Sequence, residues 1–143
     1  MPHWFRYTTQ VFPHHTDYAG VVWHGAYITW LEEARIACLR AAAAVTYTQL
    51  VQADIHLPVV DLTMHYHQAL HLGDQVQLDL RLQPLKGCRW TWDYEVRSQP
   101  NQQLHATAQV TLVPINAQSG KILRQIPVTL QEVLIKLQAF FAS

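Results

Sequence analysis

The residue types that could do chemistry are concentrated in residues 13–35, PHHTDYAGVVWHGAYITWLEEAR. Asp17 lies there in a turn-rich loop, shortly before a long pattern of helical spacing. The first N–H groups of a helix have no intrahelical acceptor and carry positive partial charge. A carboxylate that faces such donors can activate water or attack a carbonyl carbon while the donors hold the oxyanion. The segment therefore indicates an enzyme in which Asp17 and the start of the helix act together.

The acidic residues allow other interpretations. An aspartate in a loop commonly caps a helix or closes a turn, which is the structural alternative for Asp17. Glu32 and Glu33, on the helix, are the alternative catalytic carboxylates. Helix carboxylates mostly serve solvation and pairing, so we interpret Glu33 as making an ion pair or an interface contact near Arg35.

The nine histidines raise the question of a metal site. His65 and His67 are two residues apart on a predicted strand, so both point to one face, and His71 lies beyond the strand end. No Asp or Cys completes a ligand set, so we interpret this pattern as the polar outer face of a strand and expect no metal or cofactor. His14 and His15 are interpreted as surface residues of the loop.

Composition limits the class of protein. The chain has 143 residues, enough for one domain over 1–143. Ten basic and ten acidic residues give a formal net charge of zero, which argues against a nucleic-acid partner. Cys38 and Cys88 do not form a disulfide framework. With no signal sequence and no apolar run of about 20 residues, we expect a cytoplasmic protein without a membrane span.

The periodicity predicts an α+β fold. A strand is expected over 3–12, a long apolar helix over 25–43 and a short helical turn over 48–53. Four further strands and a C-terminal helix follow, over 60–67, 76–83, 90–97, 104–115 and 128–141. The simplest packing is a five-stranded antiparallel sheet wrapped around the long helix. Such a sheet leaves edges that need pairing, which predicts at least a homodimer.

The segment Thr16–Tyr27, TDYAGVVWHGAY, followed by Glu33-Ala34-Arg35, resembles the hotdog-fold acyl-CoA thioesterases of the 4-hydroxybenzoyl-CoA thioesterase type. The resemblance covers nearly the whole chain. It implies an acyl-CoA substrate and a homodimer, or a tetramer built from dimers, with active sites at subunit interfaces. It also implies that Asp17 is catalytic and that the backbone N–H of His24 donates to the thioester carbonyl.

The same resemblance implies two groups of substrate-binding residues. Gly20, Val21, Trp23 and Tyr27 belong to the loop and the helix start, and Lys86, Arg89 and Arg124 would contact the phosphates of coenzyme A. The ring of His24 either orients water or only packs. Many relatives carry Asn where Ala26 stands here, so this chain lacks a hydrogen-bonding side chain at that position.

The Trp-His-Gly-Ala-Tyr variant most resembles the 1,4-dihydroxy-2-naphthoyl-CoA hydrolases of phylloquinone (vitamin K1) biosynthesis, which implies an aromatic acyl-CoA substrate. The alternatives are a thioesterase for short-chain acyl-CoA or acyl-carrier-protein substrates, and a non-catalytic module that binds acyl-CoA. A leaving thiol has a pKa of roughly 8.5, so one carboxylate can be sufficient for hydrolysis. Asp17 beside Gly20-Val21-Val22 disfavours the non-catalytic alternative.

Overall fold

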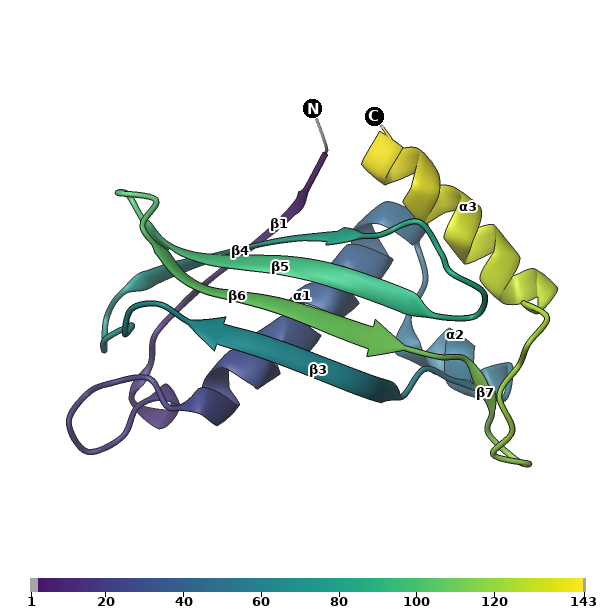
Figure 1. The fold of residues 1–143 in the computed structure, drawn as a ribbon, viewed down its shortest axis with the longest axis horizontal. Helices are drawn as coiled ribbons and strands as arrows, with labels where there is room; N and C mark the ends of the chain where they lie inside the picture. Colours follow the sequence, from purple (N-terminus) through teal and green to yellow (C-terminus); the bar gives the residue numbers. More distant parts are fainter. Residues whose placement is uncertain (1–2, 143) are drawn as a thin grey trace.

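Five strands form one antiparallel sheet in the order β1-β4-β5-β6-β3 in the computed structural model, which describes residues 3–142 (Figure 1). The strands are β1 (Phe5–Gln10), β3 (Val59–Tyr66), β4 (Gln75–Leu82), β5 (Trp90–Gln99) and β6 (Leu104–Leu112). All four strand pairs are antiparallel. The predicted five-stranded antiparallel sheet is therefore confirmed.

A second, two-stranded sheet was not predicted. It pairs β2 (Ile55–His56) with β7 (Ile115–Asn116). The strand expected over 104–115 ends earlier, at Leu112, and Ile115 belongs to β7 instead. Pro114 stands at this break, where its missing N–H prevents continuation of the ladder.

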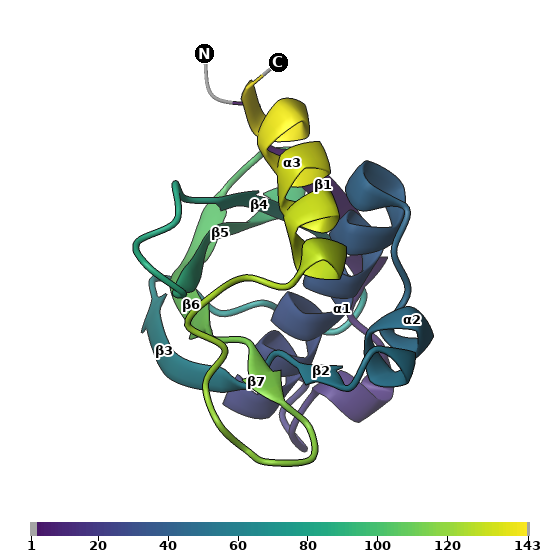
Figure 2. The ribbon, with the colours of Figure 1, turned by 90° about the vertical axis from the view of Figure 1, so that its right-hand side faces the viewer.

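Four helical segments complete the chain: η1 (Pro13–His15), α1 (His24–Ala43), α2 (Tyr47–Gln52) and α3 (Val128–Ala142). The long helix α1 crosses one face of the sheet, and α3 lies over one end of α1 and of the sheet (Figures 1 and 2). The ring of Phe141 in α3 contacts Trp92 at a centroid distance of 6.1 Å, so α3 packs on its own chain. Among residues 3–142, no helix combines the length and the apolar composition that crossing a bilayer requires.

The face of β5 that looks toward α1 is aromatic. Trp90, Trp92 and Tyr94 are 1%, 1% and 2% exposed, so this row belongs to the core. Full burial of a large apolar side chain contributes about 1.5–3 kcal/mol. The Tyr94 hydroxyl donates to the carbonyl oxygen of Leu31 and accepts from Arg35 Nη1, both at 3.2 Å. These bonds fix α1 against the sheet.

The opposite face of the sheet is polar and internally hydrogen-bonded. Along β4, side chains alternate between the two faces, so Gln77, Asp79 and Arg81 lie opposite the leucines of the core. Asp79 accepts from Arg6 at 3.0 Å and from Gln77 at 2.9 Å. Arg81 forms an ion pair with Asp93 at 3.4 Å. Most charges on this face are therefore neutralised by an immediate neighbour.

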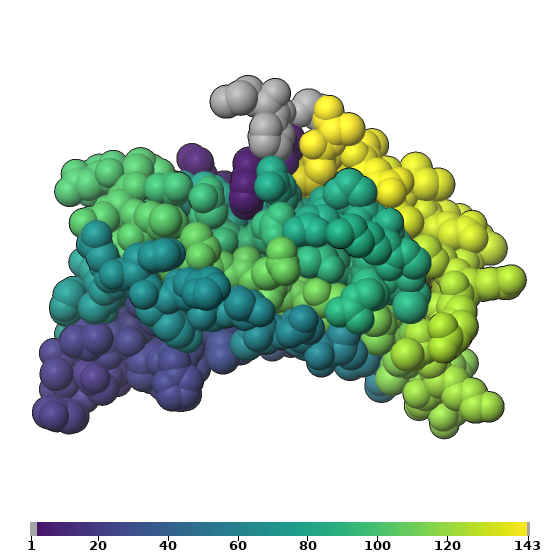
Figure 3. Space-filling model, in the orientation of Figure 1, coloured from purple at the N-terminus to yellow at the C-terminus, as the bar shows by residue number. Residues whose placement is uncertain are grey.

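Strand β3 is an uncovered edge. It is the last strand in the sheet order, and seven of its eight residues are exposed. Apolar side chains are among them, with Val60 at 51%, Leu62 at 39% and Tyr66 at 50%. Figure 3 shows the teal residues of this region along the lower border of the molecule, beside the purple and dark-blue N-terminal part of the chain. An exposed apolar edge strand is a surface that proteins normally pair or cover.

Candidate active site

The loop before α1 holds Asp17 in a tight turn. The Asp17 Oδ1 atom accepts the backbone N–H groups of Ala19 at 2.9 Å and of Val21 at 3.1 Å. The backbone N–H of Asp17 donates to the carbonyl oxygen of Val21 at 2.9 Å. Within the described part of the chain, Oδ2 has no hydrogen-bond partner. The structure thus gives Asp17 the turn-closing role with one oxygen and leaves the other oxygen available.

Glycine is needed at position 20 because the turn has a positive φ there, +77°. The carbonyl oxygen of Gly20 accepts from the N–H of Leu72 at 2.9 Å, and Val21 forms a β-bridge with His71. The N–H of Val22 donates to Leu70 at 3.0 Å. The connection between β3 and β4 therefore holds the loop in place.

The N-terminus of α1 presents free donors. The N-cap residue is Trp23, whose side chain makes no capping hydrogen bond. No acceptor lies within hydrogen-bond distance of the His24 N–H among residues 3–142. The indole of Trp23 lies against Gly25, since a Cβ at that position would be 2.2 Å from the ring. The first turn can therefore offer a backbone N–H to an incoming oxyanion.

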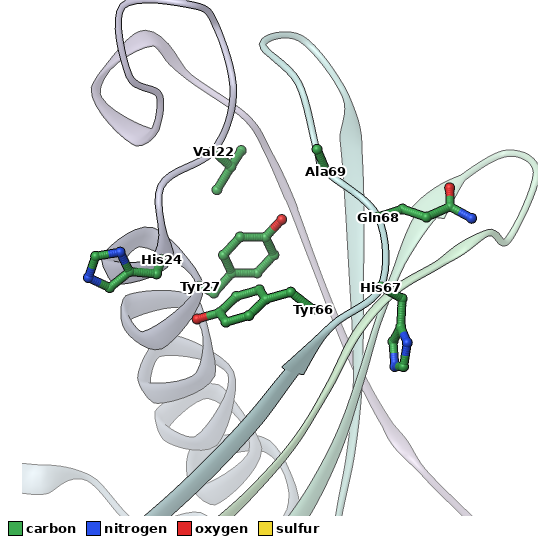
Figure 4. Close-up of a pocket in the computed structure, with 7 residues that line it drawn as sticks. All are labelled: Val22, His24, Tyr27, Tyr66, His67, Gln68 and Ala69. Atoms are coloured by element: carbon green, nitrogen blue, oxygen red, sulfur yellow. The ribbon is translucent and has the colours of Figure 1, made fainter.

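A pocket of about 330 Å³ opens beside this helix tip (Figure 4). Its lining residues come from the start of α1 and from the end of β3 with the segment after it: Val22, His24, Tyr27, Tyr66, His67, Gln68 and Ala69. The rings of Tyr27 and Tyr66 meet edge to face, with centroids 5.1 Å apart. Burial raises the pKa of both phenols, so both keep their protons at neutral pH. The pocket is aromatic and has two phenol hydroxyls.

The structure brings some of the predicted site residues together. His24 and Tyr27 line the pocket. Asp17, Gly20, Val21 and Trp23 belong to the adjoining loop and are not lining residues. The buried Ala26 packs in the core.

Sequence reasoning did not identify the other wall of the pocket, Tyr66 to Ala69. The alternation over residues 60–67 predicts Tyr66 only as one residue of a strand. The alternation of apolar and polar residues ends after His67. This end indicates that a loop follows the strand, and it is the one feature of the sequence that points to the second wall of the pocket. His67 lies beyond the end of β3 and borders the pocket, so its interpretation as part of an outer strand face is wrong. Within residues 3–142, no group of three or more His, Cys, Asp and Glu side chains could hold a metal ion.

The predicted phosphate-binding residues lie far from this pocket in the same chain. Lys86 and Arg89 are exposed in the turn between β4 and β5, where Arg89 N–H donates to the Lys86 carbonyl at 3.1 Å. The eight residues of β4 separate that turn from the pocket end of the sheet, a length of about 25 Å. Arg124 is exposed in the connection from β7 to α3, which leaves the sheet at the same distant end.

Two further expectations are corrected. His15 is buried, at 9% exposure, because its ring packs edge to face on Trp30. Of the two contacts expected of Glu33, an ion pair with Arg35 does not occur in the described residues, and a contact at a subunit interface stays a prediction. Glu33 instead accepts from the Tyr7 hydroxyl at 2.9 Å, while Arg35 turns inward to Tyr94.

Comparison with known proteins gives the family. The model of the thioesterase-like superfamily matches residues 11–136. The chain is 42% identical to "Putative esterase sll0410" of Synechocystis over 94% of this chain and 81% of that protein. It is 31% identical to the 1,4-dihydroxy-2-naphthoyl-CoA hydrolase of Crocosphaera subtropica over 71% of this chain and 74% of that one. The structure of Slr0204, a 1,4-dihydroxy-2-naphthoyl-CoA thioesterase from Synechocystis, superposes with a TM-score of 0.82 at 26% identity, covering 94% and 98% of the two chains.

The chain belongs to the thioesterase-like superfamily and has the hotdog fold. It is an acyl-CoA thioesterase, a hydrolase that cleaves thioesters. This assignment confirms the family, the fold class and the enzyme class that the TDYAGVVWHGAY segment indicated.

Proposed function

We propose that this enzyme hydrolyses an aromatic acyl-CoA, with 1,4-dihydroxy-2-naphthoyl-CoA as the preferred substrate, and so acts in phylloquinone biosynthesis. The observation that carries the proposal is the aromatic pocket at the tip of α1. Tyr27 and Tyr66 give it an aromatic wall, and the protonated hydroxyl of Tyr66, a side chain that is 50% exposed, can hydrogen-bond to a hydroxylated aromatic acyl group. A pocket of about 330 Å³ is of the size that holds a small planar ligand.

Asp17 supplies the base in this mechanism. Its Oδ2 accepts a proton from water as the water oxygen attacks the thioester carbon. The carbonyl oxygen then carries negative charge, which the His24 N–H stabilises from the positive end of α1. The tetrahedral intermediate collapses by breaking the C–S bond, and the departing thiolate takes up a proton. A thiolate leaves without a strong acid because the pKa of a thiol is only roughly 8.5.

Direct attack by Asp17 on the carbonyl carbon is the alternative mechanism, and it gives an anhydride that water then opens. One turnover in ¹⁸O-labelled water distinguishes the two. Label in the product acid supports Asp17 as base. Label retained in Asp17 after one turnover supports Asp17 as nucleophile.

A second copy of the chain completes the site in this proposal. The exposed apolar edge of β3 is continuous with Ile28 of α1, which is 39% exposed and lines the same cavity as Val59 and Leu62. This cavity of about 150 Å³ between α1 and β3 adds to the apolar surface that a partner can cover. Pairing of two β3 edges extends the sheet across a two-fold axis and buries this surface. Dimers of this kind can assemble further into the tetramer that the resemblance implies.

Antiparallel pairing of two β3 strands also explains the position of the basic residues. It puts the Tyr66 end of one strand beside the Val59 end of the other. The β4–β5 turn of the second copy, with Lys86 and Arg89, then lies at the same end of the dimer as the pocket. The phosphates of coenzyme A would be bound by one protomer while the acyl group reacts on the other.

A panel of CoA thioesters with detection of free thiol tests the proposal. The panel contains the naphthoyl, benzoyl and 4-hydroxybenzoyl esters, short aliphatic esters and an acyl-carrier-protein thioester. We expect the highest kcat/KM for the hydroxylated naphthoyl ester. Preference for aliphatic esters would contradict the aromatic assignment, and absence of hydrolysis across the panel would refute the proposed substrate class.

A further inference from the structure

His15 occupies an unusual place for a histidine of a surface loop. It is only 9% exposed, although its neighbour His14 is exposed. Its ring lies edge to face on Trp30 of α1, with centroids 5.0 Å apart, and Trp30 is completely buried. The short segment that precedes the Asp17 loop is thereby anchored to the helix that presents the His24 N–H.

Three hydrogen bonds at His15 close the base of the loop. The backbone N–H of Phe12 donates to His15 Nδ1 at 2.9 Å, and the N–H of His15 donates back to the Phe12 carbonyl at 2.9 Å. The His15 carbonyl accepts from the N–H of Trp23, the N-cap of α1, at 3.2 Å. Asp17 lies between these two attachment points, so its position relative to the helix tip depends on them.

We infer that His15 is a positioning residue for thioester hydrolysis, and that it acts only while its Nδ1 is unprotonated. This inference rests on the proposed roles of Asp17 and the helix tip. A neutral imidazole has one nitrogen that accepts, whereas an imidazolium has N–H groups on both nitrogens. Protonation therefore sets the Nδ1–H against the N–H of Phe12 and breaks the bond that closes the loop.

The surroundings keep this imidazole neutral near pH 7. Burial is the main cause that lowers the pKa of His15, and the nearby ring of His14 lowers it further. Glu33 on α1 raises it, but that carboxylate is already bound by the Tyr7 hydroxyl. The Asp17 loop is thus intact at neutral pH and is released in acid, below the ordinary histidine pKa of about 6.5.

Three variants separate this role from simple packing, with kcat/KM measured against pH on the best acyl-CoA of the panel. His15→Asn places a non-titrating oxygen close to the position of Nδ1. It should keep activity within about threefold at pH 7.5 and lose the acidic decline that we expect of the wild type below the ordinary histidine pKa of about 6.5. His15→Phe keeps the ring on Trp30 but lacks the acceptor, so kcat should be at least tenfold below that of the wild type at pH 7.5, and the difference should shrink in acid, where the wild type loses the same bond. His14→Gln is the matched control and should keep the decline, moved to slightly higher pH.

A readout without substrate tests the protonation state of His15 separately from the proposed function. In ¹⁵N-labelled wild-type protein, long-range correlations of the imidazole should show an unprotonated Nδ1 at pH 7.5. The Phe12 amide resonance should shift with the same midpoint as the acidic decline. An unchanged acidic decline in His15→Asn, full activity in His15→Phe, or a protonated Nδ1 at pH 7.5 would each overturn the inference. Absence of hydrolysis by the wild type would instead refute the proposed function, while the resonances still report on His15.

Discussion

Replacing Asp17 by asparagine separates the turn from the chemistry, because the two carboxylate oxygens have different surroundings. Oδ1 accepts from Ala19 and Val21, whereas Oδ2 has no hydrogen-bond partner in the described chain. Asparagine keeps a carbonyl oxygen at the Oδ1 position and has an NH₂ group at the position of Oδ2. The turn therefore remains hydrogen-bonded, while the proton acceptor disappears.

Asp17→Asn should change the stability of the fold much less than it changes the rate of hydrolysis. A hydrogen bond to a charged acceptor contributes about 1.5–3 kcal/mol and a neutral one about 0.5–1.5 kcal/mol. Asp17 is exposed, so screening by water reduces that difference, and we expect a loss of at most about 1 kcal/mol in the free energy of unfolding. Loss of a general base lowers kcat by about 10²–10⁴. Activity should therefore fall by more than two orders of magnitude while Tm changes by only about 4 °C.

Thiol release from a saturating aromatic CoA thioester and thermal unfolding measure the two effects on the same samples. Asp17→Ala also removes the turn acceptor, so it should unfold at a lower temperature than Asp17→Asn. Glu132→Gln, which changes an exposed carboxylate of α3, is the charge-matched control and should leave both quantities unchanged. If Asp17→Asn keeps more than a tenth of the wild-type kcat, Asp17 is not the base and its only role is to close the turn.

Four further expectations follow from the geometry. Arg89→Glu should raise KM for CoA thioesters and leave hydrolysis of a short thioester without the nucleotide unchanged; equal loss on both substrates would contradict a phosphate contact. Gly25→Ala should destabilise the wild type, because its Cβ meets the Trp23 ring at 2.2 Å, but should stabilise a Trp23→Ala background by roughly 0.5–1 kcal/mol in urea unfolding. Leu62→Asp on the edge of β3 should give a monomer in sedimentation velocity and abolish activity; an active monomer would refute the interface site. Burial raises the pKa of the Cys38 thiol to about 12, so the folded chain retains a proton that the unfolded chain releases near pH 9. Stability should fall as the pH rises from 9 to 12 under reducing conditions, with a smaller slope in Cys38→Ala.

Local patterns were sufficient to predict most of the fold. Alternation along residues 90–97 predicts a strand, and the structure has β5 there, with its aromatic face in the core. The helix predicted over 25–43 begins one residue earlier, at His24, and ends at Ala43. These elements are visible in the sequence because each buries a continuous apolar face. The two-residue strands β2 and β7 are too short to produce a period.

The parts of the site that were missed depend on contacts between distant segments. His15 looks like a surface residue until Trp30 is placed beside it. Glu33 finds Tyr7 on β1, a partner that the helix sequence cannot indicate. Tyr66 joins Tyr27 only because the sheet brings the end of β3 to the start of α1. The residues of the catalytic loop were identifiable because they are contiguous, whereas the second wall of the pocket is not.

The polar layer on the outside of the sheet has a consequence for how an anionic substrate reaches the enzyme. Its charges are arranged as contact pairs, such as Arg6 with Asp79 at 3.0 Å and Arg81 with Asp93 at 3.4 Å, on a chain of zero formal net charge. The potential of a close opposite pair decays steeply, and at physiological salt little of it extends past about 8 Å. This surface therefore neither attracts nor repels a nucleotide from a distance. Only the few Lys and Arg side chains without an acidic neighbour can attract the anionic substrate. The substrate must therefore come almost into contact with these side chains before their charge acts on it.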